Sequence, residues 1–352
     1  MLVCITGATG FVGSHLVRAL LADGHRVRAL YRNAKKLAVL DGLEYEAIEG
    51  DVTNLESLQA AFRGCDWVFH VAAVADYWNA DQEWMFTVNL GGTRNVLQAA
   101  RDASVDRVIF TSSAGALGLP ENGEASDETA HFNLLPAQFP YGYSKVLAEE
   151  AVLEAVTRYD QDVVILNPTI IIGPGDLNEI SGSFIVQGSK WQWLTPISGG
   201  GLSVIDVRDV AAAHLAAARK GRKGERYLLT TANYENTEWF GMIADVLGVA
   251  PPLFKMPDWV VPLLARFVGL LRWLRIPVPV DANQVRLATR KIYFDGSKAH
   301  VELYQPQIEL RQSLQDTYQW YRANGMIRET LVTRLLATLS QLWHRPTKQG
   351  SI

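Results

Sequence analysis

The sequence predicts an α/β fold, a doubly wound parallel sheet accompanied by a smaller, mostly helical lobe. Segments typical of strands and of helices alternate through the first two thirds of the chain, as they do in βαβ units. A glycine-spaced loop also joins the first strand to the first helix, which is typical of such sheets. With 352 residues, the chain is long enough for one large α/β domain and a second, smaller one.

The individual elements follow from the spacing of apolar residues. Short apolar runs predict strands, and apolar residues that recur every three to four positions predict helices. We expect strands over 2–5, 26–31, 66–71, 105–112 and 163–167, and helices over 14–21, 55–62, 93–103 and 144–159. Segments 203–219 and 225–231 are expected to return to the sheet.

The loop Thr6-Gly7-Ala8-Thr9-Gly10-Phe11-Val12-Gly13 is the most informative motif. Gly7 permits a tight turn, Gly10 lets the backbone approach a phosphate, and Gly13 lets the helix pack close to the strand. The start of the following helix offers free N–H groups and the positive end of its dipole to an anion. The loop therefore predicts a dinucleotide site of the Rossmann type. Its expected contributors are Gly7, Thr9, Gly10, Phe11, Val12 and Gly13.

Composition excludes several other classes of protein. A hydrophobic content of 48% with 20% charged residues is typical of a folded chain, not a disordered one. The net charge of −4 gives no reason to expect nucleic acid as a partner. Two cysteines and seven histidines form no metal-ligand pattern, so we expect no metal. The few cysteines, and a first strand too early to leave room for a signal peptide, predict a cytoplasmic location.

After the fifth strand the pattern loosens into Gly- and Pro-rich stretches. We expect a dinucleotide-binding domain over 1–168 and about 203–231. A substrate-binding lobe is expected over about 169–202 and 232–330, with a cleft between the two. Residues 331–352 form a helical, then polar tail of unknown role.

The segment 257–280 is strongly apolar, but Arg266, Arg272 and Arg275 interrupt it. No run in it therefore approaches the ~18 apolar residues of a spanning helix. We expect a helix of the substrate lobe that lines a hydrophobic pocket. The alternative is an interfacial helix that makes weak contact with a membrane surface, with the arginines on its polar side.

Tyr141 and Lys145 are four residues apart at the start of the 144–159 helix, so they share one helix face. A phenol with its ordinary pKa near ~10 is a poor acid–base catalyst at neutral pH. A nearby ammonium stabilises the phenolate and lowers that pKa. This pair therefore predicts proton transfer between Tyr141 and a carbonyl or alcohol oxygen. Lys145 is also suited to bind the ribose of a nicotinamide cofactor.

The segment Phe110-Thr111-Ser112-Ser113-Ala114 closes the fourth expected strand. The carboxyl ends of parallel strands are where α/β folds place their ligands. A serine hydroxyl there can hydrogen-bond the reacting oxygen and hold it near the tyrosine. We expect a catalytic serine at this strand end, Ser113 ahead of Ser112.

Together, the glycine loop, Ser113, Tyr141 and Lys145 resemble the extended short-chain dehydrogenase/reductase superfamily, the NAD-dependent epimerase/dehydratase family. Segments 166–169 and 199–210 most resemble dihydroflavonol-4-reductase-like proteins, including bacterial members labelled hopanoid-associated sugar epimerases. Further matches cover nearly the whole chain, at 50–52, 69–73, 89–93, 167–174 and 294–299.

The resemblance implies further contacts with a dinucleotide. Asp51 and Val52 would contact adenine, Ala72 and Ala73 would line the cofactor groove, and the backbone after Pro168 would meet the carboxamide. It also implies a homodimer through the 141–159 helix and a neighbouring helix. Other cofactor-binding residues expected from the matched segments are Asn89, Thr111, Asn167 and Pro168.

The choice of nucleotide depends on the residue after the second strand. Dehydrogenases specific for NAD place an acidic residue there, about 20 residues past the glycines, to bind the ribose 2′-hydroxyl. This chain has Arg32 instead, and a guanidinium can hold a 2′-phosphate through charge-assisted hydrogen bonds. Arg32 therefore predicts a preference for NADP(H), with NAD as the alternative. An ordinary solvated arginine is the competing interpretation.

These observations favour hydride transfer from NADPH to a ketone or aldehyde of a moderately apolar small molecule, with Tyr141 as general acid. The main alternative is a nucleotide-sugar epimerase or dehydratase that retains NAD(P). Pro140-Tyr141-Gly142 resembles those epimerases, whereas Gly115-Ala116-Leu117-Gly118 departs from the tyrosine-bearing V-Y-G that many of them have. A third hypothesis is a nucleotide sensor without catalysis, which the intact Ser113, Tyr141 and Lys145 disfavour.

Overall fold

The computed structural model of the chain describes residues 1–76, 80–121, 123–179, 182–191, 197–252, 254–257, 259–274, 276 and 282–327. The chain divides into two units. Unit 1 comprises Met1–Ile171, Ser203–Asn233 and Ile292–Ile308, and unit 2 comprises Ile172–Leu202, Tyr234–Lys291 and the chain from Glu309 on. The expected tail 331–352 lies outside the described residues.

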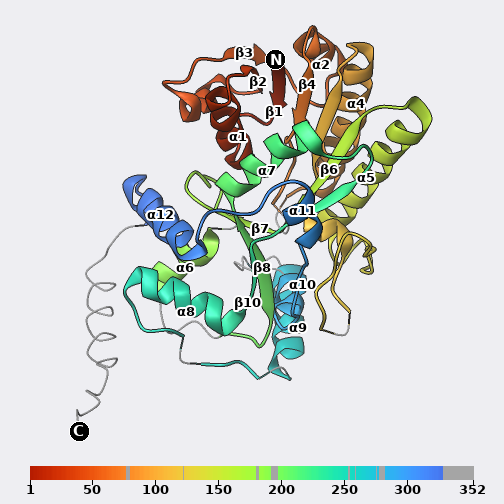
Figure 1. Cartoon of the computed structure of the whole chain (residues 1–352). Helices are drawn as coiled ribbons and strands as arrows, with labels where there is room; N and C mark the ends of the chain where they lie inside the picture. Colours follow the sequence, from red (N-terminus) through yellow and green to blue (C-terminus); the bar gives the residue numbers. More distant parts are fainter. Residues whose placement is uncertain are drawn as a thin grey trace. The chain divides into compact units, whose positions relative to one another are not determined.

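Unit 1 contains a seven-stranded sheet in which every neighbouring pair of strands is parallel (Figure 1). The strand order is β3-β2-β1-β4-β5-β6-β9, so the order reverses at β1 and the sheet is doubly wound. This confirms the predicted fold class. The strands are β1 (Leu2–Thr6), β2 (Arg26–Tyr31), β3 (Glu46–Glu49), β4 (Trp67–His70), β5 (Arg107–Thr111), β6 (Val163–Pro168) and β9 (Arg226–Leu229).

Helices cover both faces of this sheet, which is why its central strands are apolar at consecutive positions. In β1, Val3 and Ile5 pack with α1 (Phe11–Ala22) and α7 (Val207–Lys220), whereas Cys4 packs on the opposite face. That opposite face is covered by α2 (Leu55–Phe62), α4 (Gly92–Asp102) and α5 (Pro140–Tyr159). The two hydrophobic clusters hold the strand ends in register, and those ends carry the predicted site.

The strand β3 was not among the predicted elements. It is an edge strand that pairs only with β2 among the described strands, and three of its four residues are exposed. Its stability comes from the pairing with β2, so the chain signals it only by a weak polar alternation. The structure also begins α5 at Pro140, four residues before the predicted start, which places Tyr141 inside the first helical turn.

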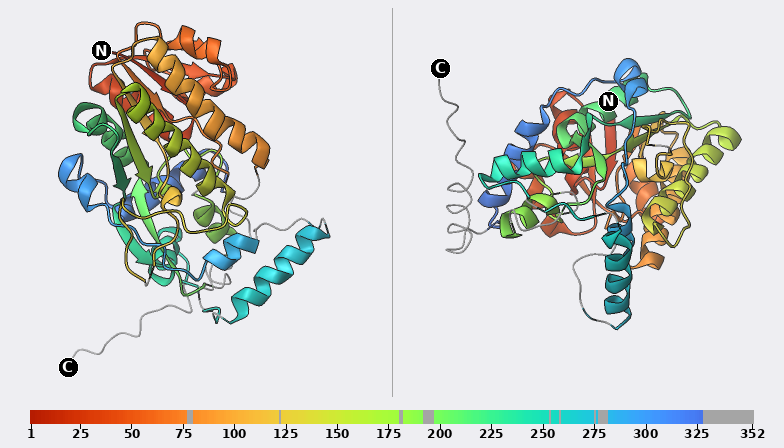
Figure 2. Two further views of the ribbon diagram at one scale, coloured as in Figure 1. Left: turned by 90° about the vertical axis from the view of Figure 1, so that its right-hand side faces the viewer. Right: turned by 90° about the horizontal axis from the view of Figure 1, so that it is seen from below.

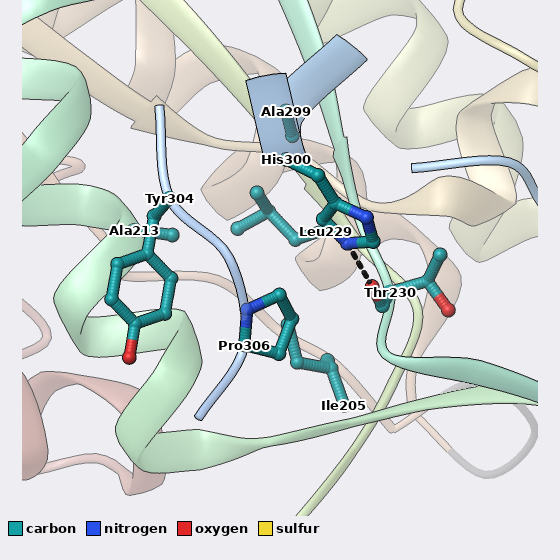
Figure 3. A pocket seen from close by; sticks show the side chains of 8 residues that line it. All are labelled: Ile205, Ala213, Leu229, Thr230, Ala299, His300, Tyr304 and Pro306. Carbon is teal, nitrogen blue, oxygen red and sulfur yellow. Dashed lines mark hydrogen bonds between the residues drawn. The ribbon is translucent and has the colours of Figure 1, made fainter. Parts of the chain in front are cut away.

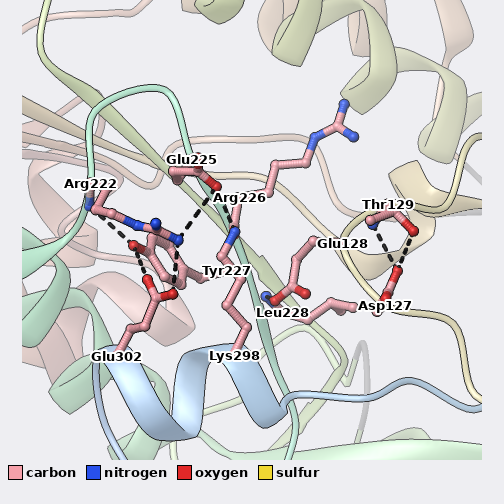
Figure 4. A network of polar contacts seen from close by, with 10 residues as sticks. All are labelled: Asp127, Glu128, Thr129, Arg222, Glu225, Arg226, Tyr227, Leu228, Lys298 and Glu302. Carbon is pink, nitrogen blue, oxygen red and sulfur yellow. Dashed lines mark hydrogen bonds and ion pairs between the residues drawn. The ribbon is translucent and has the colours of Figure 1, made fainter.

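A polar network attaches the late segment 292–308 to β9 within unit 1 (Figure 4). Lys298 Nζ, on α11 (Ser297–Glu302), donates to Glu225 Oε2 and to the Arg226 carbonyl oxygen, both at 2.7 Å. The Tyr227 hydroxyl donates to Glu302 at 2.9 Å. Residues 292–308, placed in the substrate lobe from the sequence, therefore group with unit 1.

Unit 2 is mostly helical. Its described helices are α6 (Ser183–Trp191), α8 (Asn236–Leu247), α9 (Val260–Trp273), α10 (Ala282–Leu287) and α12 (Leu310–Ala323). Helix α8 packs against α6 and α12, and Trp239 and Tyr321 are fully buried. A separate three-stranded sheet has the order β10-β8-β7 and is formed by β7 (Ile170–Ile172), β8 (Gly201–Asp206) and β10 (Ala232–Glu235). None of the described helices is both long and apolar enough to span a bilayer.

Candidate active site

The glycine loop connects β1 to α1 at the carboxyl edge of the sheet. Gly7 has φ +73°, a left-handed conformation, and a Cβ there would lie 2.8 Å from the Ala72 backbone. A Cβ on Gly13 would lie 2.0 Å from the Gly7 carbonyl oxygen. Both glycines are therefore required by the turn itself, as predicted. The turn is closed by a hydrogen bond from the Gly10 N–H to the Gly7 carbonyl oxygen at 2.9 Å.

The start of α1 fits an anionic group. Its N-cap is the exposed Gly10, which provides no side-chain cap, and no acidic residue lies in its first turn. The N–H groups of that turn therefore lack the side-chain acceptor that caps many helices. Phe11 and Val12 in this turn and Thr9 before it are half-buried. This is the arrangement that a dinucleotide pyrophosphate requires.

Arg32 and Asp51 lie after the neighbouring strands β2 and β3, on the same side of the glycine loop. The Arg32 side chain is 56% exposed, and its Nη1 lies 3.5 Å from Asp51 Oδ2. The Asp51 Oδ1 accepts from the Thr53 N–H and hydroxyl, both at 2.9 Å. Val52 is buried, with its side chain against the start of α4 at Gly92. The guanidinium is thus held near the loop by a long, partly solvated ion pair.

Residues after β4 line the next strand end. Ala72 is half-buried and its N–H donates to the Thr6 hydroxyl at 3.2 Å, whereas Ala73 is exposed. Asn89 lies in a π-helical turn, Thr87–Gly91, and is buried. Its side chain exchanges hydrogen bonds with Val74 and donates to Ser144 Oγ at 2.9 Å. Asn89 therefore ties the chain after β4 to α5.

Lys145 is enclosed one turn into α5. Its Nζ donates to the Thr111 carbonyl oxygen at 2.9 Å and lies 5.0 Å from the centre of the Phe110 ring. Burial lowers the pKa of Lys145 to about 8, and the nearby Glu149 carboxylate opposes part of that shift. A buried ammonium with a lowered pKa is unusual outside functional sites.

Tyr141 lies one turn before Lys145 on the same helix. Its side chain is buried, and its ring packs beside Phe139 with 5.9 Å between ring centres. Gly142, the next residue, lets the Ser113 segment approach α5, because a Cβ there would lie 2.6 Å from the Gly115 carbonyl oxygen. The tyrosine helix and the predicted serine are therefore brought together by a glycine.

The structure separates the two candidate serines. The Ser112 hydroxyl is buried and donates to the Glu149 carboxylate. The Ser113 Oγ accepts from the Gly115 N–H at 3.1 Å and caps a short 3-10 helix, Ala114–Leu117, so its own O–H proton is not used by that bond. The Ser113 hydroxyl proton is therefore available to another acceptor, whereas that of Ser112 is donated to Glu149.

Glu149 is a buried acidic residue that sequence reasoning missed. Its Oε1 accepts from Ser112 and from the Asn167 amide, the latter at 2.6 Å, and its Oε2 lies 2.7 Å from Arg226 Nε. The Asn167 amide also donates to the Ser113 carbonyl oxygen at 3.0 Å. The sequence does contain a signal for Glu149: it is four residues after Lys145, so the two side chains share one helix face.

Two buried histidines beside the site have lowered pKa values, which favour the neutral ring. Burial, aided by the Lys145 charge, lowers the pKa of His70 to about 3, and burial lowers that of His214 to about 4. His70 Nδ1 lies 2.9 Å from Thr6 Oγ1, and His214 Nε2 lies 2.8 Å from Thr111 Oγ1. Both rings therefore support the strand ends. Among the described residues, no group of three or more His, Cys, Asp or Glu is arranged to hold a metal ion.

A small apolar pocket elsewhere in unit 1 involves none of these residues (Figure 3). It is lined by Ile205, Leu229, His300 and Tyr304 among others, and it is too small to admit a water molecule. His300 Nε2 lies 2.8 Å from the Thr230 carbonyl oxygen at its edge. The pocket is therefore a packing defect rather than a ligand site.

The family described as "NAD dependent epimerase/dehydratase family" matches residues 3–229. Three relatives carry names of reductive or sterol chemistry. "Putative dihydroflavonol 4-reductase" of Synechocystis sp. is 36% identical over 92% of this chain and 95% of its own. "Sterol demethylase protein B" of Methylococcus capsulatus is 33% identical over 93% and 100%. "Cinnamoyl-CoA reductase 1" of Petunia hybrida is 32% identical over 72% and 79%.

Solved structures show the same fold. The structure of gox2253 has a TM-score of 0.82 at 32% identity, over 93% of this chain and 99% of its own. A nucleoside-diphosphate-sugar epimerase from Pseudomonas aeruginosa has a TM-score of 0.78 at 27% identity, over 93% and 99%. A UDP-glucose 4-epimerase from Thermus thermophilus in complex with NAD has a TM-score of 0.73 at 25% identity, over 92% and 99%.

Proposed function

The chain belongs to the NAD dependent epimerase/dehydratase family, and from this premise we propose that it is an NADPH-dependent reductase. Its substrate would be a ketone or aldehyde of a moderately apolar small molecule. The observation that carries the proposal is the buried Lys145, with its lowered pKa, one helical turn from the buried Tyr141 and hydrogen-bonded to the strand end that leads to Ser113. A buried amine with a lowered pKa destabilises the fold, and such groups cluster at functional sites, where they assist proton transfer.

The chain's residues would handle the proton of the reduction. Tyr141 would give its phenolic proton to the carbonyl oxygen, and the Lys145 ammonium would stabilise the phenolate that results. The Ser113 hydroxyl would donate to the same oxygen and orient it. A bound nicotinamide would supply the hydride to the carbonyl carbon. The uncapped start of α1 would hold its pyrophosphate.

Arg32 supports a preference for NADPH. This side chain is more than half exposed, and its long ion pair with Asp51 leaves guanidinium donors facing solvent near the glycine loop. A 2′-phosphate could accept several of them at once. The Asp51 carboxylate opposes this preference, because it would repel a phosphate placed close to it. The balance therefore depends on how far Arg32 can turn from Asp51.

Two relatives support an apolar substrate by their names, "Cinnamoyl-CoA reductase 1" and "Sterol demethylase protein B". A cinnamoyl group and a sterol are both largely apolar. The expected nucleotide-sugar alternative has support of its own. The solved epimerase from Pseudomonas aeruginosa shares the fold at 27% identity, and the segment 140–142 resembles those enzymes.

The first experiment measures the dissociation constants of NADPH and NADH by nicotinamide fluorescence. For Arg32→Ala we expect NADPH to bind about tenfold more weakly, the size of one charge-assisted hydrogen bond, with NADH unchanged. Arg158→Ala is the matched control, since Arg158 is also exposed and forms one surface ion pair. Equal binding of the two nucleotides by the unmodified protein would refute the Arg32 argument and favour the epimerase or dehydratase.

The second experiment tests catalysis with Tyr141→Phe. Loss of a general acid should lower turnover of an apolar ketone or aldehyde by about 10²–10⁴-fold, with NADPH affinity unchanged. A nucleotide sensor would keep its function in this variant. The predicted homodimer through 141–159 and the cytoplasmic location stay predictions, which sedimentation and cell fractionation would test.

A further inference from the structure

Helix α9 has one packed face and one solvent-facing apolar face. Val261, Ala265 and Val268 are buried on the packed face. Among the described helices, α10 is the one that packs closely against α9, and Figure 2 shows the two side by side. The sequence led us to expect this helix to line a pocket. Its large side chains instead point to solvent.

These exposed side chains form a stripe, here called the apolar face, which is interrupted by Arg266. With 100° per residue, its members fall within an arc of about 120° around the helix. Such a run of large apolar residues exceeds the scattered exposure that is normal for a surface. The members are between 51% and 77% exposed: Trp259, Leu263, Phe267, Leu270, Trp273 and Leu274.

The dimensions of α9 suit a position in the plane of a membrane surface. Its 14 residues are too few to cross a bilayer, which needs about 20. Trp259 and Trp273, the two most exposed members, lie at opposite ends of the helix. Tryptophan prefers the boundary between headgroups and acyl chains, because its ring is apolar and its N–H is polar.

The charge around the apolar face has one dominant sign. Residues 255–291 contain seven Lys and Arg against two Asp, within a chain of net charge −4. One of the seven, Lys291, is paired with Glu235 of β10 at 2.6 Å, which leaves six against two. Arg266 is exposed and lies between Leu263 and Leu270 on the same helix side. Lys255, Arg286 and Arg290 of this segment are exposed as well. A surface of this kind is attracted to anionic headgroups, and long arginine side chains can reach them.

A second copy of the chain fits this face poorly. A twofold dimer would place the same surface against itself. The excess of Lys and Arg would then meet an equal excess of the same sign, which opposes association. An anionic lipid surface supplies both the apolar layer and the opposite charge.

We propose that the apolar face of α9 binds the surface of a bilayer that contains anionic lipid. The proposal does not depend on the proposed reductase activity. The helix lies parallel to the membrane, with Trp259 and Trp273 at headgroup depth and Arg266 paired with lipid phosphate.

The test is flotation of the full chain with vesicles of phosphatidylcholine and phosphatidylglycerol in equal parts, and with pure phosphatidylcholine vesicles. We expect binding to the mixed vesicles, weaker binding to the pure ones, and release by high salt. The variant Leu263→Ser/Leu270→Ser should lower the partition coefficient about tenfold or more. The matched control, Leu135→Ser/Val301→Ser, removes two aliphatic side chains elsewhere that are even more exposed, 67% and 82%, and should bind like the unmodified chain.

Three outcomes would overturn the proposal. One is no binding of the unmodified chain to the mixed vesicles. Another is an equal loss in the variant and the control. The third is a dimer, seen by light scattering, that the variant dissociates while vesicle binding stays the same, because the face would then belong to a second copy. Circular dichroism of both variants establishes that they are folded.

Discussion

Lys145 offers the sharpest test of the site, because its burial links stability to pH. Replacement by Met keeps the length and the packing of the side chain but removes the amine. The pKa of the lysine is about 8 in the folded chain, against its ordinary value of 10.5. Since the folded pKa is depressed, the group's contribution is fully present above 10.5 and is lost as the pH falls toward 8.

The magnitude follows from these two values. At pH 7.5 the buried ammonium lowers the free energy of unfolding by about 3 kcal/mol, and at pH 9.5 by only about 1.5 kcal/mol. The variant also loses the hydrogen bond to Thr111, which costs about 1 kcal/mol or more at either pH. This loss cancels when the two pH values are compared. The free energy of unfolding of Lys145→Met, minus that of the unmodified chain, should therefore be higher at pH 7.5 than at pH 9.5 by about 1.5–2 kcal/mol.

The assay is urea unfolding of both proteins at pH 7.5 and 9.5, with NADPH turnover measured alongside. The variant should lose turnover at both pH values. A stability difference that does not change with pH would refute the reasoning, because it would mean that Lys145 is solvated or titrates normally. Arg158→Met, an exposed cation on the same helix, is the control and should show no such dependence.

Three further predictions concern the surroundings of the site. Glu149→Gln should lower the free energy of unfolding by about 3 kcal/mol, because it leaves Arg226 without its carboxylate. Urea unfolding measures this change, and an unchanged midpoint would show that the ion pair contributes nothing. Gly13→Ala should weaken NADPH binding about tenfold or more in a fluorescence titration, since its Cβ would displace the loop backbone, whereas Gly241→Ala, in open space on α8, should not. Because the pKa of His214 is lowered to about 4, its stabilisation is present above its ordinary 6.5 and is lost as the pH falls. Between pH 7.5 and pH 5, the free energy of unfolding of His214→Gln should therefore fall by about 2 kcal/mol less than that of the unmodified chain. Urea unfolding at the two pH values measures this, and equal losses would contradict burial of the neutral ring.

Features that depend on local chemistry can be predicted from the amino-acid sequence. The turn at Gly7 is one of them, because a left-handed residue between a strand and a helix favours glycine. The shared face of Tyr141 and Lys145 is legible because helical spacing is regular. The parallel sheet can be predicted because strand and helix segments alternate along the chain, as βαβ units require.

Tertiary structure decided what depends on partners distant in the chain. The sequence does not show that Glu149 would meet Arg226, because Glu149 lies on helix α5 and Arg226 on strand β9, far apart in the chain. The strand β3 exists because β2 offers it a free edge. The clearest case is α9, because its apolar residues are compatible both with a face buried in the fold and with a face exposed to solvent. Only the packing around Val261, Ala265 and Val268 shows which side is covered, since a hydrophobic period marks an apolar face without naming what covers it.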